Sequence, residues 1–278
     1  MSESILEIYP DHGREHSLKG LYLQQNLRAL AEGRSHPFIY ANFNTSLDGR
    51  IAIPHPEGGL TVPGSISNQR DWRLFQEIAI QADIMLSSGR YLREYAEGRA
   101  QEILRIYDDP DLADLADWRL TQGLERFPPI AVISASLDFP IPPALIEDGR
   151  RVVVLTTEEA SEGRKQELTH LGLEVISAGK TQVLGEAAIK SLAERGYHLI
   201  YSAAGPRVLH MLLEGKVLNR LYLTIAARVL GGDPHSSIIE GPLLSRPAEF
   251  NLQKLYLDLE APGSGGQLFA AYETKDRD

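Results

Sequence analysis

The stretch HLIYSAAGPRVLHMLLEG, residues 198–215, decides the fold class of this chain. A short apolar run at 198–201 predicts a strand, and the apolar residues that follow at helical spacing predict a helix to about Glu214. Pro206 suits the first turn of that helix because proline has no N–H to leave unpaired there, and Gly215 is expected to end it in the left-handed conformation. A strand that leads directly into a helix is the repeating unit of an α/β sheet.

The same alternation of strands and helices runs along most of the chain. The predicted strands lie at 38–43, 83–87, 130–134, 151–156, 173–176 and 220–226, and the predicted helices at 18–30, 67–81, 91–123, 158–170 and 182–195. The segments 252–259 and 267–273, joined by 262–266, predict a hairpin. We therefore expect a mixed, mainly parallel sheet covered by helices on both faces, with a C-terminal antiparallel hairpin. Residues 1–16 are polar and are expected to form a loose lead-in.

Composition and charge narrow the classes of function. The chain has 278 residues, no cysteine and a formal net charge of −10. The lack of cysteine excludes a thiol nucleophile, a disulfide framework and a cysteine-ligated metal, and it fits the reducing cytoplasm, where we expect the protein. The acidic balance argues against binding to nucleic acid, which needs clustered Lys and Arg. Residues 1–10 lack a signal-peptide pattern and no apolar run is long enough to span a bilayer, so we expect no membrane partner.

The turn from strand to helix at 203–207 is the first candidate binding feature. Glycine lets a ligand approach the backbone closely, and the free N–H groups of a first helical turn can hold a phosphate. Arg207 adds a positive charge at the same point. An ordinary strand-to-helix turn also explains these residues, and by themselves they favour that plainer interpretation.

Two further segments place polar residues where apolar strands end. They are NFNTSLDGRIA at 42–52 and ADIMLSSGR at 82–90. Ligands of mainly parallel sheets collect at the carboxyl ends of the strands, so we expect both segments at the same edge as the turn at 203–207. Asp48 before Gly49 also fits a plain turn.

Taken together and in this order, the three segments resemble one family, the reductase domain of the bifunctional riboflavin-biosynthesis deaminase–reductase, which has the dihydrofolate reductase fold. The most specific match is TSLDGRIA at 45–52; further matches are Ile66-Ser67 with the helix after it, Asp83, Gly89-Arg90, Ala204-Gly205-Pro206 and Val229-Leu230-Gly231-Gly232. The resemblance covers about residues 37–273 and includes no deaminase domain with its zinc motif. It implies a dihydrofolate-reductase-like three-layer sandwich at 36–278, preceded by an N-terminal extension with a helix at 1–35.

The resemblance also implies a role for each matching residue. Asn44 and Thr45 would lie beside the nicotinamide of NADPH, and Asp48 would face the substrate as an anchor or as a proton source. The other expected cofactor-binding residues are Ser88, Gly89, Arg90 and Ser134 at the adenosine phosphate end, and Ala204, Gly205, Pro206, Arg207, Val208 and Leu209 around the pyrophosphate. Family members reduce the ribose of 5-amino-6-(5-phosphoribosylamino)uracil by hydride transfer, chemistry that the cofactor carries. The same resemblance implies a homodimer.

The substrate side of the family pattern is matched less well. Ala203 stands where the family has a glutamate that contacts the substrate, and Leu115 stands where a phosphate-binding segment has an arginine. Residues 90–92 also stand where the family has a threonine. The sequence therefore leaves two functions open. One is an NADPH-dependent reductase of a pyrimidine or pterin-like heterocycle, and the other is an NADPH-binding relic or regulatory protein without riboflavin-pathway turnover.

Other motifs are weaker. The GKT turn at 179–181 lacks the glycine that a phosphate-binding P-loop has five positions earlier, because Glu174 is there. The run HGREH at 12–16 spells an inverted zinc-protease pattern but lies in the polar lead-in. The acidic stretch at 108–117 lacks the glycine and the spacing of a calcium loop, and no GxGxxG motif predicts a Rossmann dehydrogenase. We expect no metal site.

Overall fold

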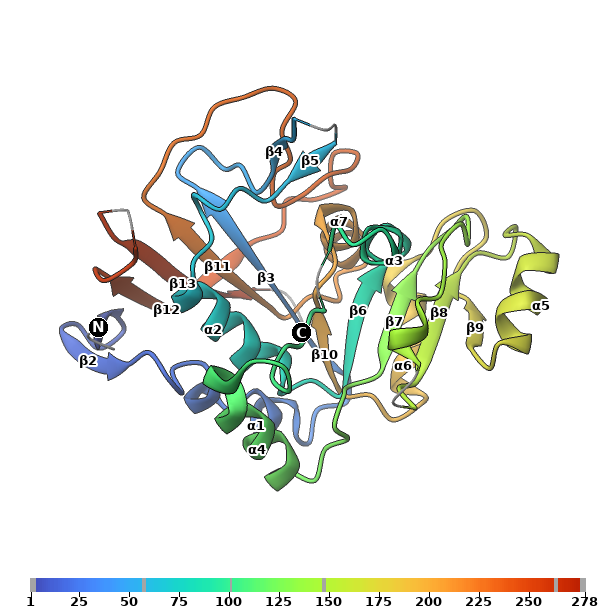
Figure 1. Cartoon of the computed structure of the whole chain (residues 1–278), viewed down its shortest axis with the longest axis horizontal. Helices are drawn as coiled ribbons and strands as arrows, with labels where there is room; N and C mark the ends of the chain where they lie inside the picture. Colours follow the sequence, from blue (N-terminus) through green and yellow to red (C-terminus); the bar gives the residue numbers. More distant parts are fainter. Residues whose placement is uncertain (1–3, 57–58, 101, 147–148, 263–264, 276–278) are drawn as a thin grey trace.

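The computed structural model describes residues 4–56, 59–100, 102–146, 149–262 and 265–275. An eleven-stranded sheet forms its centre, and β4 (Ile53–Pro54) and β5 (Leu60–Thr61) form a separate pair (Figure 1). The order across the main sheet is β2 (Arg14–Ser17), β1 (Ser4–Tyr9), β12 (Phe250–Asp258), β13 (Gln267–Thr274), β11 (Arg220–Ala226), β3 (Phe38–Ser46), β10 (Leu199–Ser202), β6 (Ile84–Ser88), β7 (Ile130–Ile133), β8 (Val152–Thr156) and β9 (Glu174–Ser177). The predicted turn at 262–266 lies partly outside the described residues.

The direction of the strands divides this sheet into two parts. From β11 to β9 every neighbouring pair is parallel. From β11 through β13, β12 and β1 to β2 every pair is antiparallel. The mixed, mainly parallel sheet with a C-terminal antiparallel hairpin that the sequence predicts is therefore confirmed.

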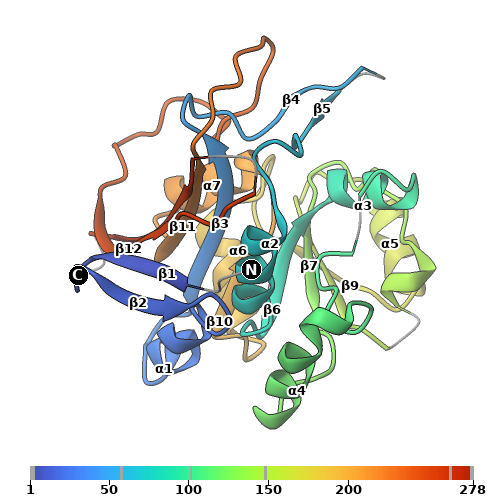
Figure 2. The same cartoon turned by 60° about the vertical axis from the view of Figure 1, so that its left-hand side comes forward.

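Helices cover both faces of the sheet. They are α1 (Leu27–Ala31), α2 (Gln69–Ala79), α3 (Gly89–Ala96), α4 (Ala113–Thr121), α5 (Glu162–His170), α6 (Gly185–Ala193) and α7 (Pro206–Glu214), with short 3-10 turns η1 (Leu23–Gln25), η2 (Pro110–Leu112) and η3 (Pro143–Leu145). Successive side chains of a strand point to opposite faces. Tyr40 of β3 accordingly packs in the apolar core that contains Leu74 of α2, whereas its neighbour Ile39 packs in the core that contains Leu209 of α7. The helices α2 and α7 therefore cover different faces of the sheet (Figure 2). The chain is a three-layer α/β sandwich, as predicted. Among the described helices, none has the length and apolar character that a membrane span requires.

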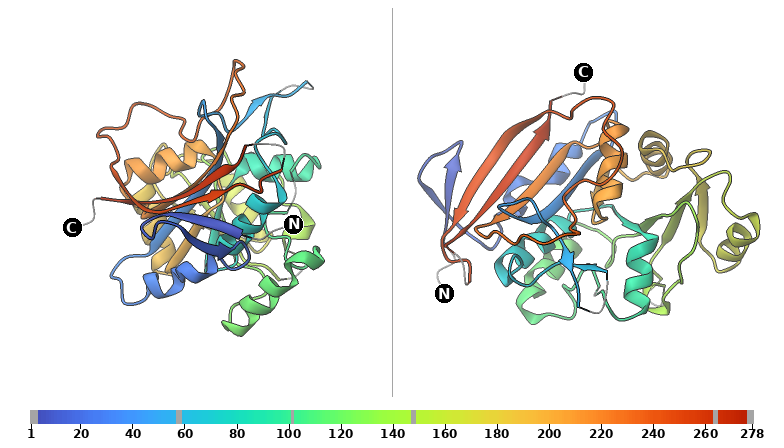
Figure 3. Two further views of the ribbon diagram at one scale, coloured as in Figure 1. Left: turned by 90° about the vertical axis from the view of Figure 1, so that its left-hand side faces the viewer. Right: turned by 90° about the horizontal axis from the view of Figure 1, so that it is seen from above.

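The N-terminal segment is not the loose lead-in that its polar sequence predicts. It forms the hairpin of β1 and β2, and β1 extends the main sheet by pairing with β12 (Figure 3). The buried carboxylate of Glu7 accepts hydrogen bonds from His16 at 2.5 Å and from Lys254 at 2.6 Å. The prediction was wrong because Lys254, which compensates the buried charge, is distant in the sequence.

Two helix predictions were also wrong in extent. The helix expected at 18–30 is reduced to η1 and α1, because Asn26 adopts a left-handed φ of 44° between them and caps α1 with its side chain. The helical stretch expected at 91–123 is divided into α3, η2 and α4.

The prediction that Gly215 ends α7 in the left-handed conformation was also wrong. Gly215 ends α7 with a right-handed φ of −76°, and Lys216 takes the left-handed conformation instead. A Cβ at Gly215 would lie 3.0 Å from the backbone nitrogen of Glu186, so close packing of α7 on α6 explains this glycine.

A buried ion pair fixes the beginning of α2. Arg70 donates from Nε and Nη2 to the two carboxylate oxygens of Asp258, both at 2.8 Å, and Gln267 donates to the same carboxylate at 2.9 Å. Asp258 is fully buried. Asn68 caps α2 with its side-chain oxygen and donates from its amide nitrogen to Gln267 at 2.8 Å. The first turn of α2 is therefore joined to the antiparallel part of the sheet.

Replacing Asp258 by alanine should destabilise the protein strongly, because the guanidinium of Arg70 would remain buried without its partner. Breaking a buried pair in this way costs about 3–5 kcal/mol. The free energy of unfolding from urea titrations measures the effect. Lys275→Ala is the matched control, since its 3.1 Å ion pair with Glu249 is exposed and such pairs contribute about 0–1 kcal/mol. Equal losses in the two variants would contradict the anchoring role of Asp258.

Candidate active site

The predicted site residues meet at the edge where the parallel strands end. Ser202, the last residue of β10, pairs in register with Leu86, two residues before the end of β6, and with Ala41 of β3, which continues for five more residues to Ser46 beside β11. The last residues of β3 and β6 and the segments that follow β6, β7 and β10 carry the residues predicted to bind the cofactor: Asn44, Thr45, Ser88, Gly89, Arg90, Ser134, Ala204, Gly205, Pro206, Arg207, Val208 and Leu209. Figure 1 shows α3 and α7 beginning at this edge.

The start of α7 is open. Gly205 is the N-cap residue in an extended conformation, no side chain caps the helix, and Pro206 occupies the first turn. A Cβ on Gly205 would meet no atom within 4 Å, and its φ of −75° is one that any residue adopts. Neither strain nor packing requires glycine here. The backbone N–H groups of Val208 and Leu209 donate to Gly205 within the helix, which makes these two residues part of its internal bonding.

The start of α3 is packed rather than open. A Cβ on Gly89 would lie 2.9 Å from the ring of Phe139 and 3.1 Å from the hydroxyl oxygen of Ser134. Ser88 caps α3 by accepting a hydrogen bond from the backbone of Tyr91 at 3.3 Å. Close contact between α3 and the loop after β7 therefore requires Gly89.

Arg90 points into solvent from the same helix start. Its side chain is 59% exposed and pairs with Glu94 at 2.8 Å. Because one exposed ion pair holds it weakly, this guanidinium is free to turn toward an anionic ligand at little cost.

A pocket of about 470 Å³ lies beside this helix start, lined by residues 136–140 and Arg164. Arg164 of α5 donates to the carbonyls of Leu137 at 3.3 Å and Phe139 at 2.7 Å, and Ser134 accepts from the backbone of Leu137 at 3.1 Å. Sequence reasoning missed Arg164, because a single arginine on a polar helix gives no signal of the loop that it supports.

The end of β3 is bonded to α2. The amide nitrogen of Asn44 donates to the carbonyl of Ile66 at 2.6 Å and to the carboxylate of Asp71 at 3.0 Å. The hydroxyl of the buried Thr45 donates to the carbonyl of Ser46 at 3.1 Å. Asn44 is therefore fixed by α2 and the segment before it, and Thr45 is fixed within its own strand.

The carboxylate of Asp48 is held by several donors. It accepts from the hydroxyl of Ser46 at 2.5 Å, from the backbone of Leu230 and Gly231 at 3.2 and 2.8 Å, and from Arg50 at 2.8 Å. These hydrogen bonds, that of Ser46 first and that of Gly231 next, lower the pKa of Asp48 well below its ordinary value of 3.8. Asp48 is therefore a carboxylate at neutral pH that fixes the 229–232 segment against the end of β3.

Asp71 also lies at the candidate site. The sequence placed it only within a predicted helix and gave it no role. Burial raises its pKa from 3.8 to about 6, and hydrogen bonds from Thr224 and Asn44 oppose the shift only in part. The sequence contains one signal of this: Asp71 lies on the helical face that Leu74 and Ile78 bury. An acid on the apolar face of an amphipathic helix is the kind of group whose pKa burial perturbs.

The family model that matches this chain is the RibD C-terminal domain, over residues 37–259. The chain belongs to the RibD C-terminal domain family. A pyrimidine reductase-like protein of Corynebacterium diphtheriae superposes with a TM-score of 0.64 at 23% identity, over 87% of this chain and 93% of that chain. No curated protein sequence matched.

Two further solved structures share the fold. A Thermotoga maritima protein named as a diaminohydroxyphosphoribosylaminopyrimidine deaminase/5-amino-6-(5-phosphoribosylamino)uracil reductase gives a TM-score of 0.57 at 15% identity, over 91% of this chain and 62% of that chain. The riboflavin biosynthesis reductase Rib7 of Saccharomyces cerevisiae gives 0.53 at 14% identity, over 92% and 98%. The resemblance to the reductase domain that the sequence motifs indicated is confirmed.

At two positions, Ala203 and Leu115, the sequence differs from the family pattern expected to contact the substrate, and both residues pack in or against the apolar core. Ala203, at the position of the family's glutamate, packs against the core that contains Tyr201 and Leu74. Leu115 is fully buried in that core and has no group to bind a phosphate. Asp114 beside it pairs with Arg73 at 2.5 Å. The region of α4 therefore supports α2 and offers no phosphate-binding arginine at the expected position.

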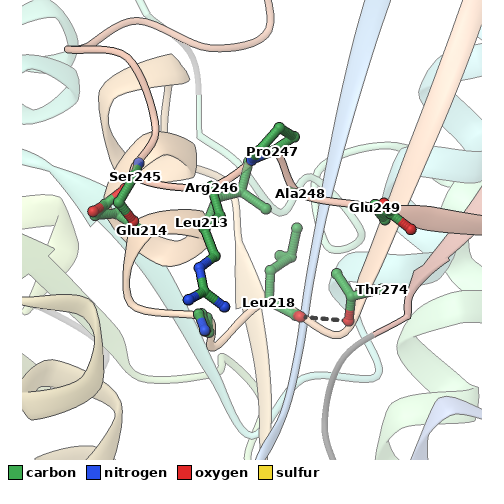
Figure 4. Close-up of a pocket in the computed structure, with 10 residues that line it drawn as sticks. Leu213, Glu214, Leu218, Ser245, Arg246, Pro247, Ala248, Glu249 and Thr274 are labelled. Carbon is green, nitrogen blue, oxygen red and sulfur yellow. Dashed lines mark hydrogen bonds between the residues drawn. The ribbon is translucent and has the colours of Figure 1, made fainter.

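A second cavity belongs to the opposite edge of the sheet. Figure 4 shows it between the end of α7 and residues 245–249, with a volume of about 300 Å³. Thr274 and Leu218 line it, and the hydroxyl of Thr274 donates to the carbonyl of Leu218 at 2.9 Å. This cavity lies where β11 begins and is separate from the candidate active site. Among the described residues no group of His, Asp and Glu side chains is arranged to hold a metal ion.

The two glycines that begin α3 and α7 should respond differently to alanine. Gly89→Ala overfills the contact with Phe139 and should cost about 1–3 kcal/mol of stability. Gly205→Ala enters open space at an ordinary φ and should change stability by no more than about 0.5 kcal/mol. Urea unfolding of both variants measures the difference. Equal destabilisation would show that the start of α7 is packed as tightly as that of α3.

Proposed function

We propose that this chain is an NADPH-dependent reductase that acts on a pyrimidine of the riboflavin pathway, of the kind of 5-amino-6-(5-phosphoribosylamino)uracil. Membership of the RibD C-terminal domain family supports this function, and so do the names of the Thermotoga maritima and Saccharomyces cerevisiae neighbours. The observation that carries it is the open, uncapped start of α7 at the carboxyl edge of the sheet. A helix start of this kind is suited to bind a phosphate.

The residues around this edge fit the chemistry of a dinucleotide. Gly205 leaves room beside the first turn of α7 for a pyrophosphate, and Arg207, whose side chain is 89% exposed, supplies a mobile positive charge. Arg90 and the pocket that Arg164 supports would hold the adenosine phosphate end. Asn44 at the end of β3 would lie at the nicotinamide. When bound, the cofactor supplies the hydride.

The cofactor assignment predicts that Gly205→Ala loses NADPH affinity while it keeps its fold. The new methyl group would occupy the space beside the first turn and remove close contact between phosphate and backbone. Such hydrogen bonds to charged groups contribute about 1.5–3 kcal/mol. Titration of cofactor fluorescence should therefore show a dissociation constant raised at least about tenfold.

Gly265→Ala is the matched control for that titration. Gly265 lies between β12 and β13, in the antiparallel part of the sheet, where a Cβ would meet no atom within 4 Å and where no residue is assigned to the cofactor site. This variant should bind NADPH as the wild type does. An unchanged affinity in Gly205→Ala would remove α7 from the cofactor site, and no binding of NADPH to the wild type would refute the proposed function.

We propose that Asp48 is a positioning residue of this reductase. Its ionised carboxylate already accepts hydrogen bonds from Ser46, Leu230 and Gly231 and pairs with Arg50, which favours the anchoring role over that of a proton source. In that role it would hold the 229–232 segment beside the reacting groups.

Asp48→Asn should lower turnover by roughly 10- to 100-fold through misplacement of that segment. Its pH–rate profile should keep the shape of the wild-type profile, and NADPH affinity should stay nearly unchanged. Steady-state kinetics across pH 5–9 measure this. Loss of a pH-dependent limb in Asp48→Asn would instead make Asp48 a proton donor.

A second candidate function, an NADPH-binding protein without riboflavin-pathway turnover, is favoured by Ala203 and Leu115. Steady consumption of NADPH with 5-amino-6-(5-phosphoribosylamino)uracil or a related compound decides between the two. The preference for NADPH over NADH and the homodimer both stay predictions, and comparative cofactor titration and sedimentation equilibrium test them.

A further inference from the structure

We propose that the cavity between the end of α7 and residues 245–249 binds a small carboxylate with an apolar body, and that this ligand regulates cofactor binding. The regulatory part rests on the proposed function. The cavity has a volume of about 300 Å³, at the lower end of the range for small-molecule sites. It lies where β11 begins, at the opposite edge of the sheet from the candidate active site. A ligand there would therefore not compete directly with NADPH.

The walls of the cavity include an apolar surface. Leu213 comes from α7, Leu218 from the turn that follows this helix, and Pro247 and Ala248 from the irregular segment before β12 (Figure 4). Small-molecule sites are lined mainly by such groups, which bury the apolar part of the ligand, while a few polar groups fix its orientation. The volume of the cavity suits a single ring or a short alkyl chain.

The acidic groups that line the cavity already have partners. Glu214 accepts a hydrogen bond from the backbone nitrogen of Ser245 at 3.1 Å and another from the side chain of the same residue. Glu249 pairs with Lys275 at 3.1 Å. The carbonyls of the last turn of α7 accept from the backbone N–H groups of residues 215–217. A cationic ligand would therefore have to displace the present partners of these groups.

Arg246 is the charged group that remains for a ligand. Among the described residues, no hydrogen bond or ion pair involves its guanidinium, and Figure 4 shows its side chain extending beside Leu218. Lys216, which follows α7, adds an ammonium group to the same lining. The planar fork of an arginine binds both oxygens of a carboxylate, so the cavity combines an anchor for an anion with an apolar wall.

An irregular segment connects the cavity to the candidate active site. Residues 236–249, which we call the α7 strap, begin next to the turn that contains Asp48 and end at the cavity. At the first end, the backbone of Ser236 donates to the carbonyl of Ala52 at 3.1 Å and accepts from the nitrogen of Ile51 at 2.9 Å. The strap is therefore bonded at one end to the loop after β3.

The α7 strap is also bonded to each turn of α7. Its contacts run from the start of the helix to its end: the nitrogen of Glu240 donates to the carbonyl of Pro206 at 3.3 Å, His210 donates to the carbonyl of Pro242 at 2.8 Å, and Ser245 donates to Glu214 at 3.1 Å. The three helix residues are four apart and lie on one face. A Cβ on Gly241 would overlap the ring of His210, so the strap lies directly against the helix.

This arrangement gives a ligand in the cavity a physical route to the cofactor edge. Coupling between distant sites is carried by chains of packed and hydrogen-bonded groups. A carboxylate bound by Arg246 would fix residues 245–249 at the end of α7, and the strap would transmit that constraint to Pro206 and to the loop after β3. Pro206 lies in the helix turn proposed to bind the pyrophosphate.

Phenylacetate, with one ring and one carboxylate, is a suitable probe of the cavity. Isothermal titration calorimetry of the wild type should show one site per chain with a dissociation constant below about 1 mM. Arg246→Ala should raise that constant at least about tenfold, because hydrogen bonds to a charged group are lost. Arg14→Ala is the matched control, since Arg14 is an exposed arginine of the N-terminal hairpin, and it should bind phenylacetate as the wild type does.

Three results would overturn the site. They are no binding of phenylacetate to the wild type, equal affinity in the wild type and Arg246→Ala, and binding of benzylamine, the cationic analogue, as tight as that of phenylacetate. Each would show that Arg246 does not select an anion in this cavity.

Cofactor titrations test the coupling. Saturating phenylacetate should change the dissociation constant of NADPH at least about fivefold, and NADPH should change that of phenylacetate by the same factor. His210→Ala, which loses the contact with Pro242, should bind each ligand alone as the wild type does and show a smaller factor. An NADPH affinity that phenylacetate leaves unchanged would overturn the regulatory role.

The failure of this proposal and that of the proposed function give different results. If the wild type binds no NADPH but binds phenylacetate in a manner that depends on Arg246, the proposed function fails and the site stands. If NADPH binds and is consumed with a pyrimidine while phenylacetate does not bind, the proposed function stands and the site at the end of α7 is refuted.

Discussion

The ion pair between Arg70 and Asp258 fixes where α2 begins, and the candidate active site depends on that position. Burying two charges costs several kcal/mol per ion before their attraction is counted, so such a pair is retained for its geometry more than for net stability. Here the geometry is a bidentate contact that joins the first turn of α2 to the antiparallel strands. Asp71 follows Arg70 directly, and its carboxyl group reaches the parallel strands at Asn44. This ion pair therefore fixes where the half-buried Asp71 lies relative to the edge of the sheet.

The fold follows from local patterns wherever neighbours in sequence are neighbours in space. The apolar runs of the central strands and the periodicity of α6 and α7 predict those elements, because burial on one or both faces leaves a regular signal. The N-terminal hairpin was not predictable in this way. Glu7 contributes a charge to the pattern of β1, and the partner that makes its burial tolerable, Lys254, lies at the other end of the chain.

The candidate site likewise has one part that local sequence predicts and one part that depends on residues distant in the sequence. The half proposed to bind the cofactor is made of strand-to-helix turns, in which a glycine, a proline or a serine can be recognised from a few neighbouring residues, as at Gly205 and Ser88. The half built around Asp71 depends on contacts between elements. The pKa of Asp71 is raised only because β3 and β11 pair and α2 packs across them, which removes its carboxyl group from water. The residues next to Asp71 in the sequence give no sign of this. Arg164 escaped prediction for the same reason, since its partners are carbonyls of a distant loop.

Two aspartates at one sheet edge thus have opposite environments. Asp48 gathers a hydroxyl, two backbone N–H groups and a guanidinium, all of which stabilise its charge. Asp71 has only neutral donors and pays a desolvation cost that these donors do not cancel. Pairs of carboxyl groups whose pKa values are driven apart are the usual means by which one site holds a fixed charge and a mobile proton together.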